Sequence, residues 1–141
     1  MDLARPPFTL SDDPARLDKD WIVRTLKETY WAGARPEAII LKAMEQSTQY
    51  GIYHEDGTTI QQVGFARMVS DHCTFAWLCD VVVAPASRGR GLGKWLVESV
   101  TNDPQWNTCT LYLVTRDAHT LYERNGFARH EVLRRSRKVE W

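Results

Sequence analysis

The chain has 141 residues, of which 43% are hydrophobic, and this length and composition suit one domain with a core of its own. Its 18 basic and 18 acidic residues give a formal net charge of zero, so no bulk charge attracts it to nucleic acid or to an anionic membrane. No apolar run approaches the roughly 20 residues of a membrane span, and residues 1–13 lack a secretory signal pattern. We therefore expect a single cytoplasmic domain over residues 1–141 that binds neither nucleic acid nor membranes.

The first half of the chain predicts a strand, two helices and a hairpin. Residues 8–13 fit a short strand, and the apolar residues within 17–30 fall close to helical spacing. A proline opens the second predicted helix, residues 36–47. Two extended runs within residues 50–71 then meet at Asp56-Gly57, which is a strong hairpin signal.

The second half of the chain alternates strands and helices. Residues 73–85 and 108–115 read as strands, whereas residues 91–100 and 117–125 read as helices. The basic segment from Phe127 onward offers one or two last strands. This order favours an α/β fold of the mixed α+β kind, with helices on both faces of one sheet.

The three cysteines are Cys73, Cys79 and Cys109, and no two of them have the spacing C-x-x-C. An odd number of widely spaced cysteines predicts neither a disulfide framework nor a zinc site, and we expect no metal. Free cysteine is often a core residue, so we predict three buried thiols.

A loop rich in glycine and arginine precedes the helix of residues 91–100. Its glycines permit a close approach of the backbone to a ligand, and a helix start offers free N–H groups and a positive dipole end. The pattern therefore predicts an anion site, most often for phosphate. It fits neither a P-loop nor a Rossmann fingerprint, since Arg88, Lys94 and Trp95 stand where those motifs require other residues. A tight turn without a ligand is the alternative.

Two motifs in this half resemble those of the GNAT superfamily of N-acetyltransferases. Arg88-x-x-Gly91-x-Gly93 is similar to the family's acetyl-coenzyme A signature, [Q/R]-x-x-G-x-[G/A]. Residues 118–127, AHTLYERNGF, resemble the family's A-x-x-L-Y-E-x-x-G-F. The resemblance implies a GNAT-type fold, in which a mostly antiparallel sheet has splayed fourth and fifth strands.

The resemblance also implies an activity. The acetyl group of acetyl-CoA would move directly to a primary amine, which we expect to belong to a small molecule. The alternative is a noncatalytic acetyl-CoA sensor or partner-binding module, since a fold does not establish turnover. A homodimer is left open.

The family's cofactor contacts carry over to a strand end and the loop that follows it. The strand backbone would hold the pantetheine arm in the gap between the splayed strands, and the loop N–H groups would hold the pyrophosphate. Thr115 stands where the family often has an asparagine, and its hydroxyl can make only part of that hydrogen-bonding pattern. The predicted cofactor-binding residues are Val81, Val82, Val83, Arg88, Gly89, Arg90, Gly91, Leu92, Gly93, Lys94 and Thr115.

Four residues are predicted to act on the substrates. Tyr122 matches the family's general acid for the departing thiolate, with a packing tyrosine as the alternative. Asp80 is predicted to attract or deprotonate the amine; alternatively it bonds to the backbone or to a neighbouring arginine. Tyr30 and Trp31 are predicted to wall the acceptor site, or else to pack onto the sheet. Asp117 is expected to N-cap the helix that carries Tyr122.

Overall fold

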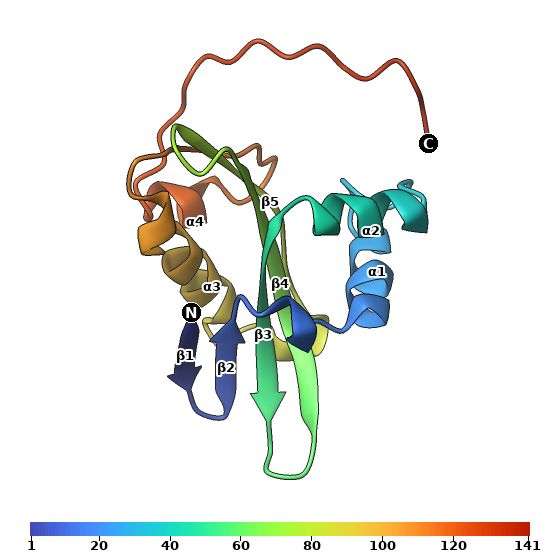
Figure 1. Cartoon of the computed structure of the whole chain (residues 1–141), viewed down its shortest axis with the longest axis vertical. Helices are drawn as coiled ribbons and strands as arrows, with labels where there is room; N and C mark the ends of the chain where they lie inside the picture. Colours follow the sequence, from blue (N-terminus) through green and yellow to red (C-terminus); the bar gives the residue numbers. More distant parts are fainter.

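The computed structural model describes residues 1–141, and its six strands form one sheet in the order β1-β2-β3-β4-β5-β6 (Figure 1). Neighbouring strands are antiparallel, except that β6 pairs parallel with β5. The predicted mixed, mostly antiparallel sheet is confirmed. Because β1 was not predicted, the expected fourth and fifth strands are β5 and β6. The strands are β1 (Asp2–Arg5), β2 (Phe8–Ser11), β3 (Thr48–Glu55), β4 (Ile60–Ser70), β5 (Phe75–Val83) and β6 (Thr110–Tyr112).

Four α-helices cover the two faces of the sheet, as the sequence predicts. They are α1 (Lys19–Lys27), α2 (Glu37–Glu45), α3 (Leu92–Thr101) and α4 (His119–Glu123). The first two lie on one face, and the last two lie on the other (Figure 1). None of these helices has the length and apolar character needed to cross a membrane.

Each face of the sheet has its own core. The apolar side of α3 packs on one face, where Leu92, Leu96 and Val100 join a cluster of 13 buried residues. Helices α1 and α2 pack on the other face, in a cluster of eight that includes Leu26 and Ile40. Three- and four-residue spacing within each helix places these side chains on one stripe.

One extra residue in β5 reverses the faces to which its side chains point. Asp80 and Val81 stand together opposite Ala66 of β4, and Asp80 has a φ of +55°. Before this β-bulge Leu78 packs in the α3-side core, and after it Val82 packs in the α1/α2-side core. Regular alternation would put both side chains on the same face. The bulge therefore lies where β5 changes from one core to the other.

Two sequence expectations are wrong. Residues 127–141, for which one or two last strands were predicted, form no strand, and from residue 128 the chain runs exposed over the outside of the molecule (Figure 1). Four of the five residues from Arg134 to Lys138 are basic, so neither side of a strand there would be apolar. Cys73 is exposed, whereas Cys79 and Cys109 are partly buried. The backbone N–H of Cys73 donates to the Asp71 carboxylate in the β4–β5 turn, and this turn keeps Cys73 at the surface.

A buried hydrogen-bond network joins β3 to the segment before β6. The Tyr50 hydroxyl donates to Asp103 Oδ2 at 2.7 Å and accepts from Trp106 Nε1 at 2.9 Å. Burial, followed by the hydrogen bond to Asp103, raises the pKa of Tyr50, so the phenol stays protonated. The neighbouring Tyr53 is also buried, but its hydroxyl has no hydrogen-bond partner.

We expect Tyr50→Phe to lower the free energy of unfolding by about 1–3 kcal/mol, because buried Trp106 Nε1 loses its acceptor and Asp103 keeps only its bonds from Gln105. Tyr53→Phe removes the same atom from a site without partners, so its effect should stay within about 0.5 kcal/mol or be stabilising. Urea denaturation of the two variants measures both values. An equal loss in both variants would contradict the network's role.

Candidate functional site

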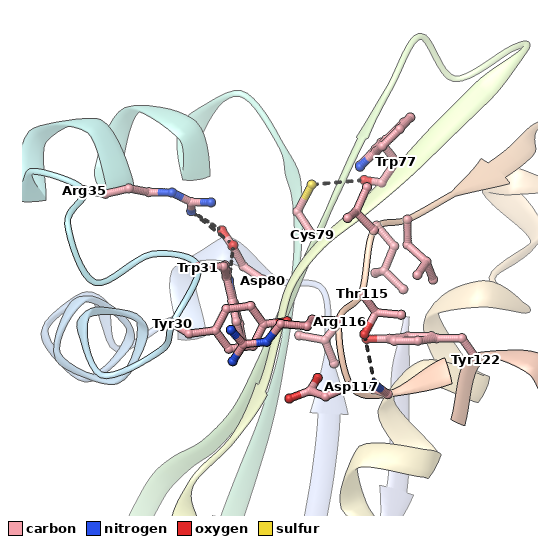
Figure 2. A pocket seen from close by; sticks show the side chains of 15 residues that line it. Tyr30, Trp31, Arg35, Trp77, Cys79, Asp80, Thr115, Arg116, Asp117 and Tyr122 are labelled. Atoms are coloured by element: carbon pink, nitrogen blue, oxygen red, sulfur yellow. Dashed lines mark hydrogen bonds and ion pairs between the residues drawn. The ribbon is translucent and has the colours of Figure 1, made fainter. Parts of the chain in front are cut away.

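Strands β5 and β6 separate after only three residue pairs, the last of which joins Trp77 to Tyr112. A cavity of about 350 Å³ opens beyond this point (Figure 2). Its wall comes from residues 78–81 of β5, residues 113–118 after β6, the α1–α2 loop and α4. Six of the predicted catalytic, substrate-binding and cofactor-binding residues line this one cavity: Tyr30, Trp31, Asp80, Val81, Thr115 and Tyr122.

The glycine loop continues from the end of β5 and opens α3. Gly91 is the N-cap residue with a φ of +74°, and no side chain caps the helix start. A Cβ at Gly93 would meet only Val83 Cγ2, at 3.9 Å, so the backbone there is open to a ligand. The loop therefore combines free helix N–H groups with space beside them, as an anion site requires.

The predicted cofactor residues divide between two places. Val81 lines the cavity, whereas Val83 and residues 88–94 continue from it along the strand into the loop. Arg88 Nε donates to the carbonyl oxygen of Val83 at 3.3 Å, so this arginine also holds the loop to the strand. The side chain of Val82 belongs to the opposite core and its backbone pairs with Phe65 of β4, so the structure does not bring this predicted cofactor residue to the free edge.

The sequence analysis missed an arginine at this loop. Arg5, the last residue of β1, has Nη2 3.8 Å from the place that a Cβ of Gly91 would occupy. Its guanidinium also lies over the ring of Trp95, 5.9 Å from the ring centroid. No sequence signal could have found it, because more than 80 residues separate Arg5 from the loop. The loop thus has a cation from β1 in addition to its own.

Asp80 is the most highly bonded side chain in the cavity. Only 3% of its side chain is exposed, and its carboxylate accepts hydrogen bonds from three residues, of which Figure 2 shows Trp31 and Arg35. The donors are Arg67 Nε at 2.7 Å, Trp31 Nε1 at 2.9 Å, and Arg35 Nη1 at 3.0 and 3.1 Å from the two oxygens.

These contacts decide the charge of the Asp80 carboxyl. Burial raises the pKa of Asp80, but the guanidinium groups of Arg67 and Arg35 together lower it by more than burial raises it. The pKa of Asp80 therefore lies below its usual range. An ionised carboxylate with occupied oxygens has little affinity for another proton. The arrangement therefore matches the second interpretation of Asp80, in which it bonds to neighbouring arginines, and does not favour the base role.

Tyr122 of α4 faces the gap between the strands. Burial raises its pKa to about 12, so the phenol is protonated at neutral pH and can donate a proton. The sequence had predicted that Asp117 caps this helix, and this prediction is wrong. Ala118 is the N-cap residue, and its N–H donates to Thr115 Oγ1 at 3.1 Å. Thr115 therefore stabilises the turn into α4, because its short side chain reaches the Ala118 N–H.

The cavity is bridged on its outer side. The guanidinium of Arg116 stacks over the Tyr30 ring, 3.7 Å from its centroid, and Trp31 meets Tyr30 edge to face at 5.0 Å (Figure 2). This stacking joins the α1–α2 loop to the segment between β6 and α4. Tyr30 and Trp31 both line the cavity, and they pack against each other and Arg116 while remaining exposed, so the alternative of packing onto the sheet does not describe them.

Replacing Asp80 tests the ion cluster. We expect Asp80→Asn to lower the free energy of unfolding by about 3 kcal/mol, because two arginines lose their shared counter-charge. The pKa of Asp80 is lowered by folding, so its stabilisation is complete above the unfolded pKa of about 3.9 and is lost as the pH falls through the folded value. Chemical denaturation at several pH values measures both effects.

Asp117→Asn is the matched control, since Asp117 also lines the cavity but is exposed. It should change the free energy of unfolding by less than about 0.5 kcal/mol. If Asp80→Asn were equally harmless, Asp80 would not be the anchor of the cluster.

Comparison with known proteins places this chain in a family. The family model described as "Acetyltransferase (GNAT) domain" matches residues 46–129. A Gibberella zeae protein is 30% identical over 86% of this chain and 78% of its own length. A crystal structure of a GNAT-family protein from Xanthomonas campestris is 38% identical, with a TM-score of 0.84 over 94% of this chain and 95% of its own. Both carry the name "putative acetyltransferase".

An Elizabethkingia anophelis GNAT acetyltransferase has been solved with acetyl-CoA bound. It is 16% identical to this chain, with a TM-score of 0.66 over 90% of this chain and 80% of its own. At this identity the likeness concerns the fold.

Proposed function

The chain belongs to the GNAT family of acetyltransferases and is an acetyl-CoA-dependent acyltransferase, and from this premise we propose that it acetylates the primary amine of a small molecule. One observation carries the proposal. The cavity between β5 and β6 brings a protonated phenol, a free strand edge and aromatic side chains from the α1–α2 loop to one place. These are a proton donor, a backbone template and an acceptor wall.

The residues of this chain fit acetyl-CoA. Beyond Trp77 the edge of β5 has no strand partner, so the backbone of Val81 and Val83 can bond to an extended pantetheine arm. The uncapped start of α3 can hold the pyrophosphate, with Arg5 and Arg90 nearby as cations. Bound there, acetyl-CoA supplies an activated acetyl thioester.

The transfer needs two proton movements. The nitrogen of the neutral amine forms a bond to the acetyl carbonyl carbon with its lone pair, and the carbon–sulfur bond breaks with its electron pair on sulfur. Tyr122 gives its phenolic proton to that sulfur, and solvent then reprotonates Tyr122. The nitrogen releases one proton, which we assign to solvent because Asp80 already accepts from two arginines. The products are the N-acetylated amine and coenzyme A.

The anion-binding loop is tested by Gly91→Asp. We expect the Kd for acetyl-CoA to rise at least about 10-fold, because the new carboxylate would stand at the helix start among the phosphate-binding N–H groups. Isothermal titration calorimetry measures the Kd. Gly57→Asp is the matched control, since it adds the same charge at a similarly positive φ of +93° in the β3–β4 turn. Equal Kd values in the two folded variants would remove the loop from the site.

Tyr122→Phe tests the proton donor, because it keeps the ring and removes only the hydroxyl. We expect kcat to fall by about 10²-fold to 10⁴-fold, or somewhat less, since a thiolate with a conjugate pKa near 8.5 is a tolerable leaving group. The Kd for acetyl-CoA and the melting temperature should hardly change. A variant as fast as the parent, where chemistry limits turnover, would leave Tyr122 a packing residue.

The alternative function, a noncatalytic acetyl-CoA sensor, predicts a different result. A screen of primary amines with detection of the released thiol would find no turnover, while acetyl-CoA still binds. Turnover with any small amine excludes that rival.

A further inference from the structure

The ion cluster around Asp80 carries an unbalanced positive charge. Two guanidinium groups, those of Arg35 and Arg67, share the single carboxylate of Asp80, and Trp31 adds only a neutral donor. Two positive charges and one negative charge leave a formal charge of +1 at the wall of the acceptor cavity. A buried or half-buried charge without a partner is costly, so this surplus favours an anionic ligand.

The two arginines are not equally available. Arg67 has 11% of its side chain exposed and uses two of its nitrogens on the protein, Nε on Asp80 and Nη1 on Ser47 Oγ at 3.2 Å. Arg35 has 21% exposed, lines the cavity and bonds to Asp80 only through Nη1 (Figure 2). The surplus charge is therefore presented to the cavity by Arg35.

The free part of Arg35 has a specific shape. Its Nε and Nη2 make no hydrogen bond within the protein, and together they form the planar edge of a guanidinium that pairs with both oxygens of a carboxylate. The Asp80 pair holds the opposite side of the group, and Lys27 Nζ bonds to the Arg35 carbonyl oxygen at 3.0 Å. The edge is thus presented by a side chain and a backbone that are both anchored.

The other charges around the cavity do not cancel this surplus. Arg116 and Asp117 also line it, with one charge of each sign, and both are exposed. Arg116 lies on the Tyr30 ring, on the outer side of the cavity. A polyamine would bring several positive charges toward a wall that is already positive, which disfavours that class of acceptor.

We propose that Arg35 binds a carboxylate of the acceptor, so that the substrates are small amino carboxylates such as free amino acids. This inference rests on the proposed function, since it names the acceptor class for the same site. Arg35 is the specificity-determining residue, and Asp80 is the residue that positions it. The amine end of such a substrate would then extend from Arg35 toward the gap between β5 and β6.

The first test compares matched amines on the parent enzyme. Each amino acid in the panel is paired with its own amide, which keeps the amine and side chain but removes the carboxylate charge; putrescine and spermidine are added. We expect kcat/KM to be about 10-fold to 100-fold higher for the amino acids than for their amides, as one bidentate ionic pair supplies. Higher values for the amides or polyamines would overturn the proposal.

The second test changes the side chain. Arg35→Gln should raise the KM for amino acids at least about 10-fold and leave the amides nearly unchanged, with the Kd for acetyl-CoA constant. Arg35→Lys keeps the positive charge but lacks the planar edge, so its KM for amino acids should lie between those of the parent and Arg35→Gln. Asp80 keeps its pair with Arg67 in both variants, which favours folding. Arg24→Gln removes an exposed arginine of α1 that does not line the cavity; it is the matched control and should preserve the preference for amino acids.

A binding measurement separates this inference from the proposed function. Amino acids are titrated by calorimetry into enzyme saturated with coenzyme A, for the parent and for Arg35→Gln. Binding that depends on Arg35 supports the inference even if no amine is acetylated, in which case only the proposed function fails. Binding equal in the two proteins, or absent from the parent, would overturn the inference.

Discussion

Only three residue pairs hold β6 against β5, and the parting of these strands after Trp77 and Tyr112 is the constraint on which the site depends. The two rings stack at the fork, with centroids 5.4 Å apart and planes at 11°. Beyond them the backbone groups on one edge of β5 have no strand partner. An edge that had continued pairing with β6 would have no groups left for a ligand. The same separation makes room for Tyr122 to face the gap from α4.

The bulge at Asp80 links the stability of the fold to the electrostatics of the acceptor cavity. The reversal of faces turns this carboxylate toward the α1–α2 loop, where it meets Trp31 and Arg35, while Arg67 reaches it from β4. One buried anion thus joins three segments that are distant in the sequence. Because the anion is already ionised and paired, it shapes the cavity through the arginine that it holds rather than by taking up a proton.

The two ends of the site are built differently. The proposed cofactor end comes from one stretch, residues 81–94, in which a strand, a glycine loop and a helix start follow directly. The proposed acceptor end is assembled from the α1–α2 loop, β4, β5 and the segment after β6, and the stacking of Arg116 on Tyr30 joins two of these parts. A site of this kind can keep a constant cofactor end while its acceptor wall depends on a few packed side chains.

The sequence by itself determined the features that depend on neighbouring residues. Alternation, the Asp56-Gly57 turn and the helix start at Gly91 are local, and they predicted most strands and helices, the order of the elements and the glycine loop before α3. The two motifs identified the family and placed Tyr122, because a motif on one loop and one helix keeps its geometry. Residues 127–141 misled because a strand also needs a partner edge and an apolar side, which the local pattern does not reveal.

Only the tertiary structure decided which side chains contact Asp80. Arg35 and Arg67 lie 45 and 13 residues from it along the chain, and a bulge that no local pattern announces turns its carboxylate toward both. Arg5 likewise reaches the glycine loop through strand pairing at the far edge of the sheet. The net charge of a cavity depends on side chains that are distant in the sequence, so it was decided only when the fold brought these side chains together.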